Sequence, residues 1–368
     1  MRRIRWQEDH RQGSGEDSRP SLISPPSEND AFGFSYPSSL FAELELHSRS
    51  STALPSGSFK SWSSAKLKRA CRAGLPVDLR PDVWRYLLKT EDAVIELARQ
   101  GDSYFELLKR KIPAKIGRVI QVDLKRTFPG NLKFAALQTE LRDVLFAFAV
   151  ARPDVGYCQG LNFIAGTFLI VFSADHSICS LPETAFLALY QFISNRLDIS
   201  HYFTPGMSLL LSDLSSLYSL VVNHLRLPLH PAIRSPSALT VATSEWFHTC
   251  FVTAFPFPIV LRIWDVLIAE GKKGLFRSAV GTLKAVLVHG SEMDEEELLV
   301  SHKKLTRAWG DADELLRAGF SESFSRKDLM EERGRNSFTS GTSSAQVFAS
   351  VSERVGSGSE WVLEDIGT

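Results

Sequence analysis

The amino-acid sequence predicts an all-α protein. One multi-helix domain is expected over residues 61–310, between a disordered N-terminal segment (1–60) and a flexible Ser/Gly-rich tail (311–368). Apolar residues between Trp62 and Trp309 recur at three- and four-residue steps, the spacing of one helix face. Alternating apolar and polar runs joined by Asn-Gly or Asp-Gly turns are absent. Ser, Pro and Gly crowd both ends, which therefore offer too little apolar surface to offset the entropy of ordering.

The expected helices follow one another along this domain. The first, 66–72, ends at Gly74-Leu75-Pro76, and the second, 81–88, begins with a proline, which favours the first turn of a helix. An amphipathic helix is expected at 137–148. The segment 162–172 is apolar on nearly every side, so we expect it to be central and buried. Further helices are expected at 183–193, 207–222, 258–269, 275–288 and 294–309.

Composition excludes several classes of function. Lys+Arg and Asp+Glu are both 42, so the formal net charge is +0, whereas a general nucleic-acid or anionic-membrane binder is normally strongly basic. The four cysteines form no C-x-x-C pair, which argues against a zinc site or a disulfide framework and favours reduced thiols in a cytosolic protein. The charged N-terminus is followed by no apolar run, so we expect no secretory signal, and no run of about 18 apolar residues indicates a membrane span.

Two short loops carry the candidate chemistry. Arg126 ends the run Ile120-Gln-Val-Asp123-Leu-Lys-Arg126 and is followed by Thr-Phe-Pro, and Gln159 lies within Gly156-Tyr157-Cys-Gln159-Gly-Leu-Asn162. A planar guanidinium can neutralise the charge that spreads over phosphoryl oxygens in a phosphoryl-transfer transition state. A carboxamide donates and accepts hydrogen bonds at once, so it can orient an attacking water. The pair therefore suits a protein that completes another protein's phosphoryl-transfer site.

These two runs resemble the two finger motifs of the TBC domain, the helical GTPase-activating domain for Rab GTPases. Two further blocks are similar to the same family. They are Gly74-Leu-Pro-x-x-x-Arg80-x-x-Val-Trp84, and Trp246-Phe247 followed by Phe251, Pro256, Arg262-Ile-Trp264-Asp265-Val-Leu and Glu270-Gly271. The resemblance covers residues 70–305. Leu161 and Leu187 depart from the family pattern, and so does the segment 226–243, where a changed loop would alter which GTPase is accepted.

The resemblance implies a role for each matching residue. Arg126 would be an arginine finger, and Gln159 would align water in place of the GTPase's own glutamine. Asp123, one turn before Arg126, would hold the guanidinium, while Tyr157 and Asn162 would support the glutamine loop. The implied partner is a GTP-bound Rab, and GTP and Mg²⁺ belong to that partner, so no cofactor is expected in this chain. The implied setting is vesicle traffic in the cytoplasm, with peripheral attachment to endomembranes through the Rab and no role for nucleic acid.

Three other functions can be compared with the sequence: nucleotide binding by the chain itself, a scaffold role, and cysteine catalysis. The phosphate-binding motif G-x-x-x-x-G-K-[ST] does not occur, so we expect no nucleotide site in the chain itself. We therefore expect a GTPase activator that acts on its partner's active site, and not an enzyme. The alternative is a TBC-like scaffold that binds a GTPase without stimulating hydrolysis, but such a scaffold needs neither Arg126 nor Gln159. A nucleophilic role for Cys158 is disfavoured because no histidine is near it in sequence. Trp84, Trp246 and Trp264 are expected in the core, and Asp265 in a cap or an ion pair.

Overall fold

The computed structural model describes residues 27–37, 59–175, 177–325, 327–329 and 331. The disorder predicted for 1–26, 38–58 and 332–368 concerns residues outside this part of the chain. Within it, helices dominate, which confirms the all-α fold class.

The longer helices are α2 (Ser64–Ala73), α3 (Arg80–Leu88), α4 (Thr90–Arg99), α5 (Tyr104–Lys109), α6 (Ala114–Leu124), α7 (Leu132–Ala135), α8 (Gln138–Ala151), α9 (Leu161–Phe172), α10 (Leu181–Gln191), α11 (Ser208–Ser219), α12 (Pro236–His248), α13 (Phe257–Glu270), α14 (Lys272–His289), α15 (Glu295–Arg307) and α16 (Ala312–Phe320). Short 3₁₀ turns lie at Phe59–Ser61, Ser200–Tyr202, Pro205–Met207 and Pro231–Ile233, and π turns continue α10 (Phe192–Arg196) and α11 (Leu220–His224). The strands β1 (Ser27–Asn29) and β2 (Ser35–Pro37) pair antiparallel.

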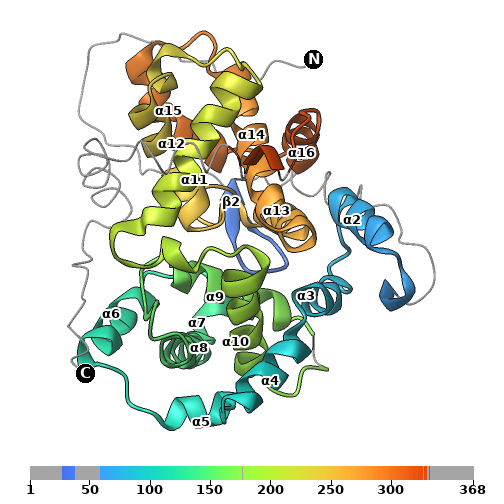
Figure 1. The fold of residues 1–368 in the computed structure, drawn as a ribbon, viewed down its shortest axis with the longest axis vertical. Helices are drawn as coiled ribbons and strands as arrows, with labels where there is room; N and C mark the ends of the chain where they lie inside the picture. Colours follow the sequence, from blue (N-terminus) through green and yellow to red (C-terminus); the bar gives the residue numbers. More distant parts are fainter. Residues whose placement is uncertain (1–26, 38–58, 176, 326, 330, 332–368) are drawn as a thin grey trace, which may run out of the picture.

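The helices form two groups along the long axis of the molecule (Figure 1). One group contains α3 to α10, and the other contains α11 to α16, with β2 between them. Helix α10 packs on α8 and α9 in the first group, and α14 packs along α16 in the second. Helix α13 contacts α2 and α3, so it joins the start of the domain to its C-terminal part.

Local sequence sets the ends of many of these helices. Six begin at an N-cap residue whose side chain accepts a hydrogen bond from the backbone N–H three residues later, which satisfies one of the donors left open at a helix start. These N-cap residues are Ser63, Ser103, Asn131, Ser235, Asp294 and Asp311. Helix α12 also starts with Pro236 in its first turn, and Pro231 starts a 3₁₀ turn, so two of the three prolines of the atypical segment 226–243 begin helices here.

The predicted tryptophans lie in the core. Trp84 and Trp264 are fully buried and Trp246 is 3% exposed, which confirms the prediction. The Trp264 ring stacks on Phe192 at a centroid distance of 4.8 Å and meets the edge of Phe168 at 5.0 Å. Phe168 belongs to α9, whose residues are buried along almost its whole length, as the uninterrupted apolar run predicts.

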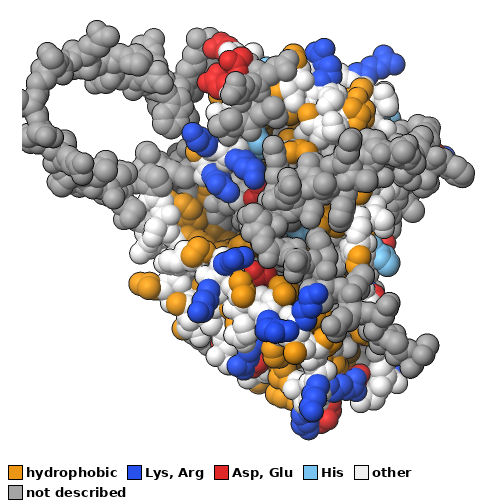
Figure 2. Space-filling model, turned by 90° about the vertical axis from the view of Figure 1, so that its left-hand side faces the viewer, with side chains coloured by type: hydrophobic (Ala, Val, Ile, Leu, Met, Phe, Trp, Pro, Cys, Tyr) orange, Lys and Arg blue, Asp and Glu red, His pale blue; other side chains and the backbone are white. Residues whose placement is uncertain are grey.

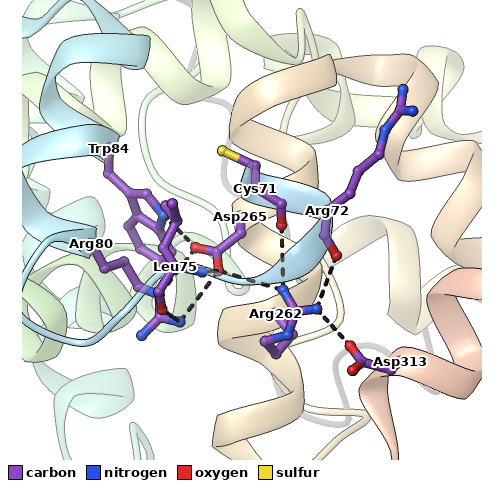
Figure 3. A network of polar contacts seen from close by, with 8 residues as sticks. All are labelled: Cys71, Arg72, Leu75, Arg80, Trp84, Arg262, Asp265 and Asp313. Carbon is purple, nitrogen blue, oxygen red and sulfur yellow. Dashed lines mark hydrogen bonds and ion pairs between the residues drawn. The ribbon is translucent and has the colours of Figure 1, made fainter. Parts of the chain in front are cut away.

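A buried carboxylate joins α13 to α3 and to the loop between α2 and α3 (Figure 3). Asp265 on α13 accepts hydrogen bonds from the Arg80 guanidinium at 3.0 Å, the Trp84 indole at 2.8 Å and the backbone N–H of Leu75 at 3.0 Å. This confirms the ion-pair role expected of Asp265. Arg262, one turn earlier, donates to the carbonyls of Cys71 and Arg72 and to Asp313 of α16. A buried carboxylate is tolerated only with such a full set of donors.

The structured part of the chain extends beyond both predicted boundaries. Residues 27–37 lie inside the segment predicted to be disordered, yet they form the β1–β2 hairpin, with Tyr36 buried against the domain. At the other end, α16 lies past the predicted boundary at residue 310. Gly281 of α14 and Gly319 of α16 allow close contact, because a Cβ on either would come within 2.2 Å of the facing backbone. The helical domain therefore includes α16.

One segment has the length and composition of a helix that could cross a membrane. It runs from Pro205 to His224 with a mean hydropathy of 1.2 over its window. In the fold, Leu210, Leu214 and Leu217 are buried in the core, and α11 packs on α12. Asp213 within the same segment accepts a hydrogen bond from Tyr202 at 2.6 Å. These contacts are those of a core helix.

Candidate functional site

The first element of the site is the arginine loop, residues 125–131, between α6 and α7. The chain leaves α6 in a tight turn. In this turn the backbone N–H of Arg126 donates to the carbonyl of Asp123, and that of Thr127 donates to the carbonyl of Leu124. The Arg126 side chain is 54% exposed, and its guanidinium lies 3.9 Å from Oδ1 of Asp123. A contact of this length holds an exposed arginine only loosely. Arg126 therefore points to solvent and can reach a partner.

Phe128 fixes the middle of the arginine loop. Its φ of 46° is in the left-handed region, which is uncommon for a bulky residue and costs roughly 1–3 kcal/mol. Its ring meets the edges of Phe34 at 5.2 Å, Phe134 at 5.1 Å and Phe163 at 5.7 Å. A Cβ on Gly166 of α9 would lie only 2.9 Å from this ring. Aromatic packing around Phe128 thus holds a strained turn two residues after Arg126.

The second element is the glutamine loop, residues 156–160. Gly156 and Gly160 have φ values of 61° and 107°, so glycine is required at both ends of this turn. The His248 ring packs directly under Gly160, where a Cβ would come within 2.7 Å of it. His248 Nε2 donates to the carbonyl oxygen of Gln159 at 2.7 Å. The backbone of Gln159 is therefore held from the core, while its side chain is partly exposed.

Hydrogen bonds join the glutamine loop to the end of α6 and the arginine loop to the start of α9. The Tyr157 hydroxyl donates to Oδ2 of Asp123 at 2.8 Å. Asn162 Nδ2 donates to the Thr127 hydroxyl at 2.7 Å, and that hydroxyl donates to the Asp123 carbonyl at 2.7 Å. Asn162 also accepts from the N–H of Gly160 through Oδ1 at 2.9 Å. The structure thus brings Asp123, Tyr157 and Asn162 together at the junction of the arginine and glutamine loops.

Burial shifts the pKa values of the two titratable side chains at this junction, Tyr157 and Asp123. Desolvation raises the pKa of Tyr157 well above its ordinary value, and the Asp123 charge raises it further, so the phenol keeps its proton and donates. Burial also raises the pKa of Asp123, while the Tyr157 hydrogen bond and the Arg126 charge oppose that shift. The protonated phenol therefore donates the hydrogen bond that joins these two side chains.

His248 is near Cys158, but the pair lacks the features of a catalytic thiol. The distance from Cys158 Sγ to His248 Nε2 is 3.9 Å. That nitrogen carries the proton it donates to Gln159, so it cannot accept one from the thiol. Burial lowers the pKa of His248 to about 4 and raises the pKa of Cys158 far above its ordinary value. A reactive cysteine needs a stabilised thiolate, and these surroundings disfavour it.

Sequence reasoning missed two residues of this site. Thr127 relays the hydrogen bond from Asn162 to Asp123, and His248 supports Gln159 from 89 positions away. Thr127 stands beside Arg126, so its place in the motif was a usable signal. His248 follows Trp246-Phe247 in a helix, and nothing local indicates that its ring lies under a glycine of another loop.

Basic and apolar side chains are exposed along α6 and at the start of α7. Lys111, Arg118 and Lys125 are exposed on α6 and its flanks. Val122 is 51% exposed and Leu132, just after the arginine loop, is 85% exposed. Figure 2, which turns the left-hand side of Figure 1 toward the viewer, shows Lys and Arg side chains among apolar ones over the lower half of that face. Such a surface suits a partner with acidic and apolar groups.

Metal-ligating residues do not gather in the described part of the chain. Over those residues no three His, Cys, Asp or Glu side chains are placed to hold one ion. The arrangement that the site does present is an exposed guanidinium and a partly exposed carboxamide loop, held side by side.

Comparison with known proteins identifies the family of this chain. A sequence model of the Rab-GTPase-TBC domain matches residues 77–286. Growth hormone-regulated TBC protein 1-A of Danio rerio is 35% identical over 253 residues, which cover 66% of this chain and 66% of that protein. TBC1 domain family member 2A of Rattus norvegicus is 34% identical over 230 residues, covering 60% of this chain and 23% of that protein. The chain thus spans 66% of the length of the first of these relatives and 23% of the length of the second.

Two solved structures share the fold. The crystal structure of the Chlamydomonas flagellar RabGAP TBC domain has a TM-score of 0.59 at 24% identity, covering 80% of this chain and 99% of that one. The Ypt/Rab-GAP domain of Gyp1p also has a TM-score of 0.59, at 20% identity, covering 77% of this chain and 98% of its own. The matched sequence model extends over more than half of the chain and contains both loops. The chain belongs to the Rab-GTPase-TBC domain family.

Proposed function

We propose that this protein is a GTPase-activating protein for a Rab-family small GTPase in its GTP-bound state. One observation carries the proposal. The Tyr157 hydroxyl of the glutamine loop donates to Asp123, 34 residues earlier at the end of α6, directly before the arginine loop. An exposed guanidinium and a carboxamide loop are thereby presented together, as a phosphoryl-transfer site completed in trans requires.

The chemistry divides between the two proteins. The GTPase supplies GTP, Mg²⁺ and the attacking water. Arg126 neutralises charge on the phosphoryl oxygens as the bond to the leaving group breaks, and its planar fork of donors matches that geometry. Gln159 donates to and accepts from the water, and so aligns it. Asp123 limits the range of the guanidinium without binding it tightly, since the two lie 3.9 Å apart.

The proposal extends to the setting of the reaction. Acceleration of hydrolysis shortens the lifetime of the active Rab and so controls vesicle traffic. We place the protein in the cytoplasm, and at endomembranes only through its Rab.

A GTP-hydrolysis screen of the full chain against a panel of GTP-loaded Rabs tests this function. Arginine fingers accelerate hydrolysis by ~10³ to 10⁵, so Arg126→Ala should abolish nearly all stimulation. Arg126→Lys should fail as well, because an ammonium group offers no planar fork. Arg99→Ala, an exposed arginine at the end of α4, is the matched control and should keep full activity.

The screen also separates activation from scaffolding. A scaffold would bind GTP-loaded Rab without accelerating hydrolysis, and Arg126→Ala would then change nothing. Near-normal stimulation by Arg126→Lys would instead show that Arg126 is not the finger.

A further inference from the structure

The β1–β2 hairpin lies outside the region that matches the family, residues 77–286. It nevertheless reaches the middle of the molecule, between the two helix groups (Figure 1). Its position in sequence, far before the arginine loop, gives no reason to expect a contact with the site.

The hairpin has its own local construction. Ser27 pairs with Pro37 and Asn29 with Ser35, and the turn between the strands is closed by Asp30. Oδ1 of Asp30 accepts from the N–H groups of Phe32 and Phe34, both at 2.9 Å. Gly33 has a φ of 88°, and a Cβ on it would come within 2.8 Å of Asn131. The tip of the hairpin is thus shaped to approach the arginine loop closely.

Aromatic contacts link this tip to the site. The Phe34 ring meets Phe128 edge-on at 5.2 Å and stacks on Phe257, the first residue of α13, at 4.5 Å. Phe32 meets the same Phe257 ring at 5.3 Å. The Tyr36 hydroxyl accepts from the backbone N–H of Phe257 at 2.9 Å. The hairpin therefore rests on the start of α13 and covers one side of Phe128.

Two hydrogen bonds hold the far end of the arginine loop to the hairpin. Asn131 Nδ2 donates to the carbonyl of Phe32 at 3.1 Å, and Lys133 Nζ donates to the carbonyl of Ala31 at 2.8 Å. Asn131 is also the N-cap of α7, where its Oδ1 accepts from the N–H of Phe134. One buried amide thus joins the end of the arginine loop, the start of α7 and the hairpin.

We propose that the hairpin Ser27–Pro37 is a positioning element for the arginine loop, through Phe34 on Phe128 and the Phe32 carbonyl on Asn131. Phe128 holds a left-handed backbone conformation, which persists only where the surroundings over-determine it. The hairpin supplies one wall of those surroundings. Without it the loop samples further conformations, and Arg126 spends less time where it can reach a phosphoryl group. The effect falls on kcat more than on KM, since the docking surface itself is unchanged.

This proposal rests on the proposed GTPase activation, and the variants are made in the full chain. Phe34→Ala should lower kcat by up to ~10²-fold, the loss expected of a misplaced catalytic group, with little change in KM. Phe34→Leu, which keeps most of the apolar contact, should restore part of the rate. Phe59→Ala is the matched control, since Phe59 is an equally half-buried aromatic residue that packs on Tyr86 at 5.7 Å, away from the site.

Asn131→Asp removes the hydrogen bond from residue 131 to the hairpin while keeping the cap on helix α7. A carboxylate still accepts from Phe134 and caps α7, but it has no N–H for the Phe32 carbonyl. We expect kcat to fall and the melting temperature to fall with it, because a buried carboxylate then faces the Phe32 carbonyl without a donor, so the cause of the kcat loss is assigned by the exchange measurement.

Hydrogen exchange of the backbone amides over 126–134 decides the proposal independently of any GTPase. Phe34→Ala and Asn131→Asp should speed exchange there, and Phe59→Ala should not. Unchanged exchange and unchanged kcat in both variants would overturn the proposal. So would equal losses of kcat and melting temperature in Phe34→Ala and Phe59→Ala, because general destabilisation would then explain them. A wild-type protein that stimulates no Rab would refute the proposed function, while the exchange measurement would still report on the hairpin.

Discussion

The Tyr157 hydroxyl donates a hydrogen bond to Asp123, the residue that also lies beside the Arg126 guanidinium. One carboxylate therefore contacts groups from both loops of the site. Its Oδ2 accepts from the phenol at 2.8 Å, and its Oδ1 faces the guanidinium at 3.9 Å. The spacing between the two loops is set by this side chain and by the Thr127–Asn162 bond next to it.

Tyr157→Phe should weaken the junction while leaving the aromatic ring in place. The change removes a donor from a buried carboxylate, which costs about 1–3 kcal/mol of folding free energy. We expect a lower melting temperature and a slower stimulated GTPase rate. In a double-mutant cycle with Asp123→Asn, the two losses should not add, because they remove the same hydrogen bond. Additive losses would show that the two side chains act separately.

Water alignment by Gln159 can be tested with a Rab whose own glutamine is replaced by leucine. The wild-type chain should still stimulate such a Rab substantially, because it brings its own carboxamide. Gln159→Ala should lose that stimulation. The assignment fails if stimulation disappears with the Rab glutamine and survives Gln159→Ala.

His248 makes stability depend on pH. Its folded pKa of about 4 is below the ordinary value of 6.5, so folding favours the neutral ring. The unfolded chain binds the proton first as the pH falls, and the stabilisation present above pH 6.5 is lost toward pH 4. By about pH 5 the loss should be roughly 2 kcal/mol.

Denaturant titrations of the wild type and of His248→Gln isolate this contribution. The glutamine does not titrate and keeps an N–H that can reach the Gln159 carbonyl. The other titrating groups are common to both proteins, so the difference between the two pH profiles belongs to His248. Parallel profiles would contradict the prediction.

Gly166→Ala should disturb the arginine loop from the helix side. The added Cβ would lie 2.9 Å from the Phe128 ring and 3.1 Å from the Phe134 ring, so one of them must shift. Overpacking of this kind typically costs ~1–3 kcal/mol, partly offset by the better helix propensity of alanine. We expect the stimulated rate to fall further than the melting temperature suggests. Gly117→Ala, whose Cβ would meet only ordinary contacts at 3.7 Å, is the control.

Trp264→Ala should destabilise the whole domain. The side chain is fully buried and its indole N–H donates to the Cys250 carbonyl at 2.8 Å. Its removal should cost ~3–5 kcal/mol, a large fraction of the stability of an ordinary domain. Circular dichroism melts should show this loss, whereas Trp62→Ala, near the domain's first turn, should melt close to the wild type.

Periodicity in the sequence predicted most of the long helices. The segment expected at 162–172 is α9 (Leu161–Phe172), and the family resemblance is confirmed by the match over residues 77–286. Helices α4, α5, α6, α7 and α12 were not predicted; four of the ten residues of α4 are charged, and α5 has only six residues. All five candidate residues, Gln159 included, were chosen from motif positions, and the structure shows the contacts that each of them makes. Their part in catalysis remains a prediction.

The hairpin could not have been predicted from local pattern. Its strands have three residues each and stand among Ser, Pro and Gly. Phe32, Phe34 and Tyr36 do alternate, but so short an alternation is too weak a signal on its own. Packing on Phe257 and Phe128 stabilises it, and those partners lie about 100 or more positions along the chain. The same holds for His248, whose contact with the glutamine loop depends on tertiary structure.

The buried Asp265 also has a consequence for how the chain folds during synthesis. Its partner Arg80 precedes it by 185 residues, and Trp84 by 181. At a translation rate of ~5–20 residues per second, the α2–α3 segment leaves the ribosome roughly 10 to 40 seconds before α13 is made. During that interval the Arg80 guanidinium and the Trp84 indole have no carboxylate to bind, and the apolar face of α3 stays open to other contacts. The nascent N-terminal half is therefore a candidate client for chaperones until the last third of the domain arrives.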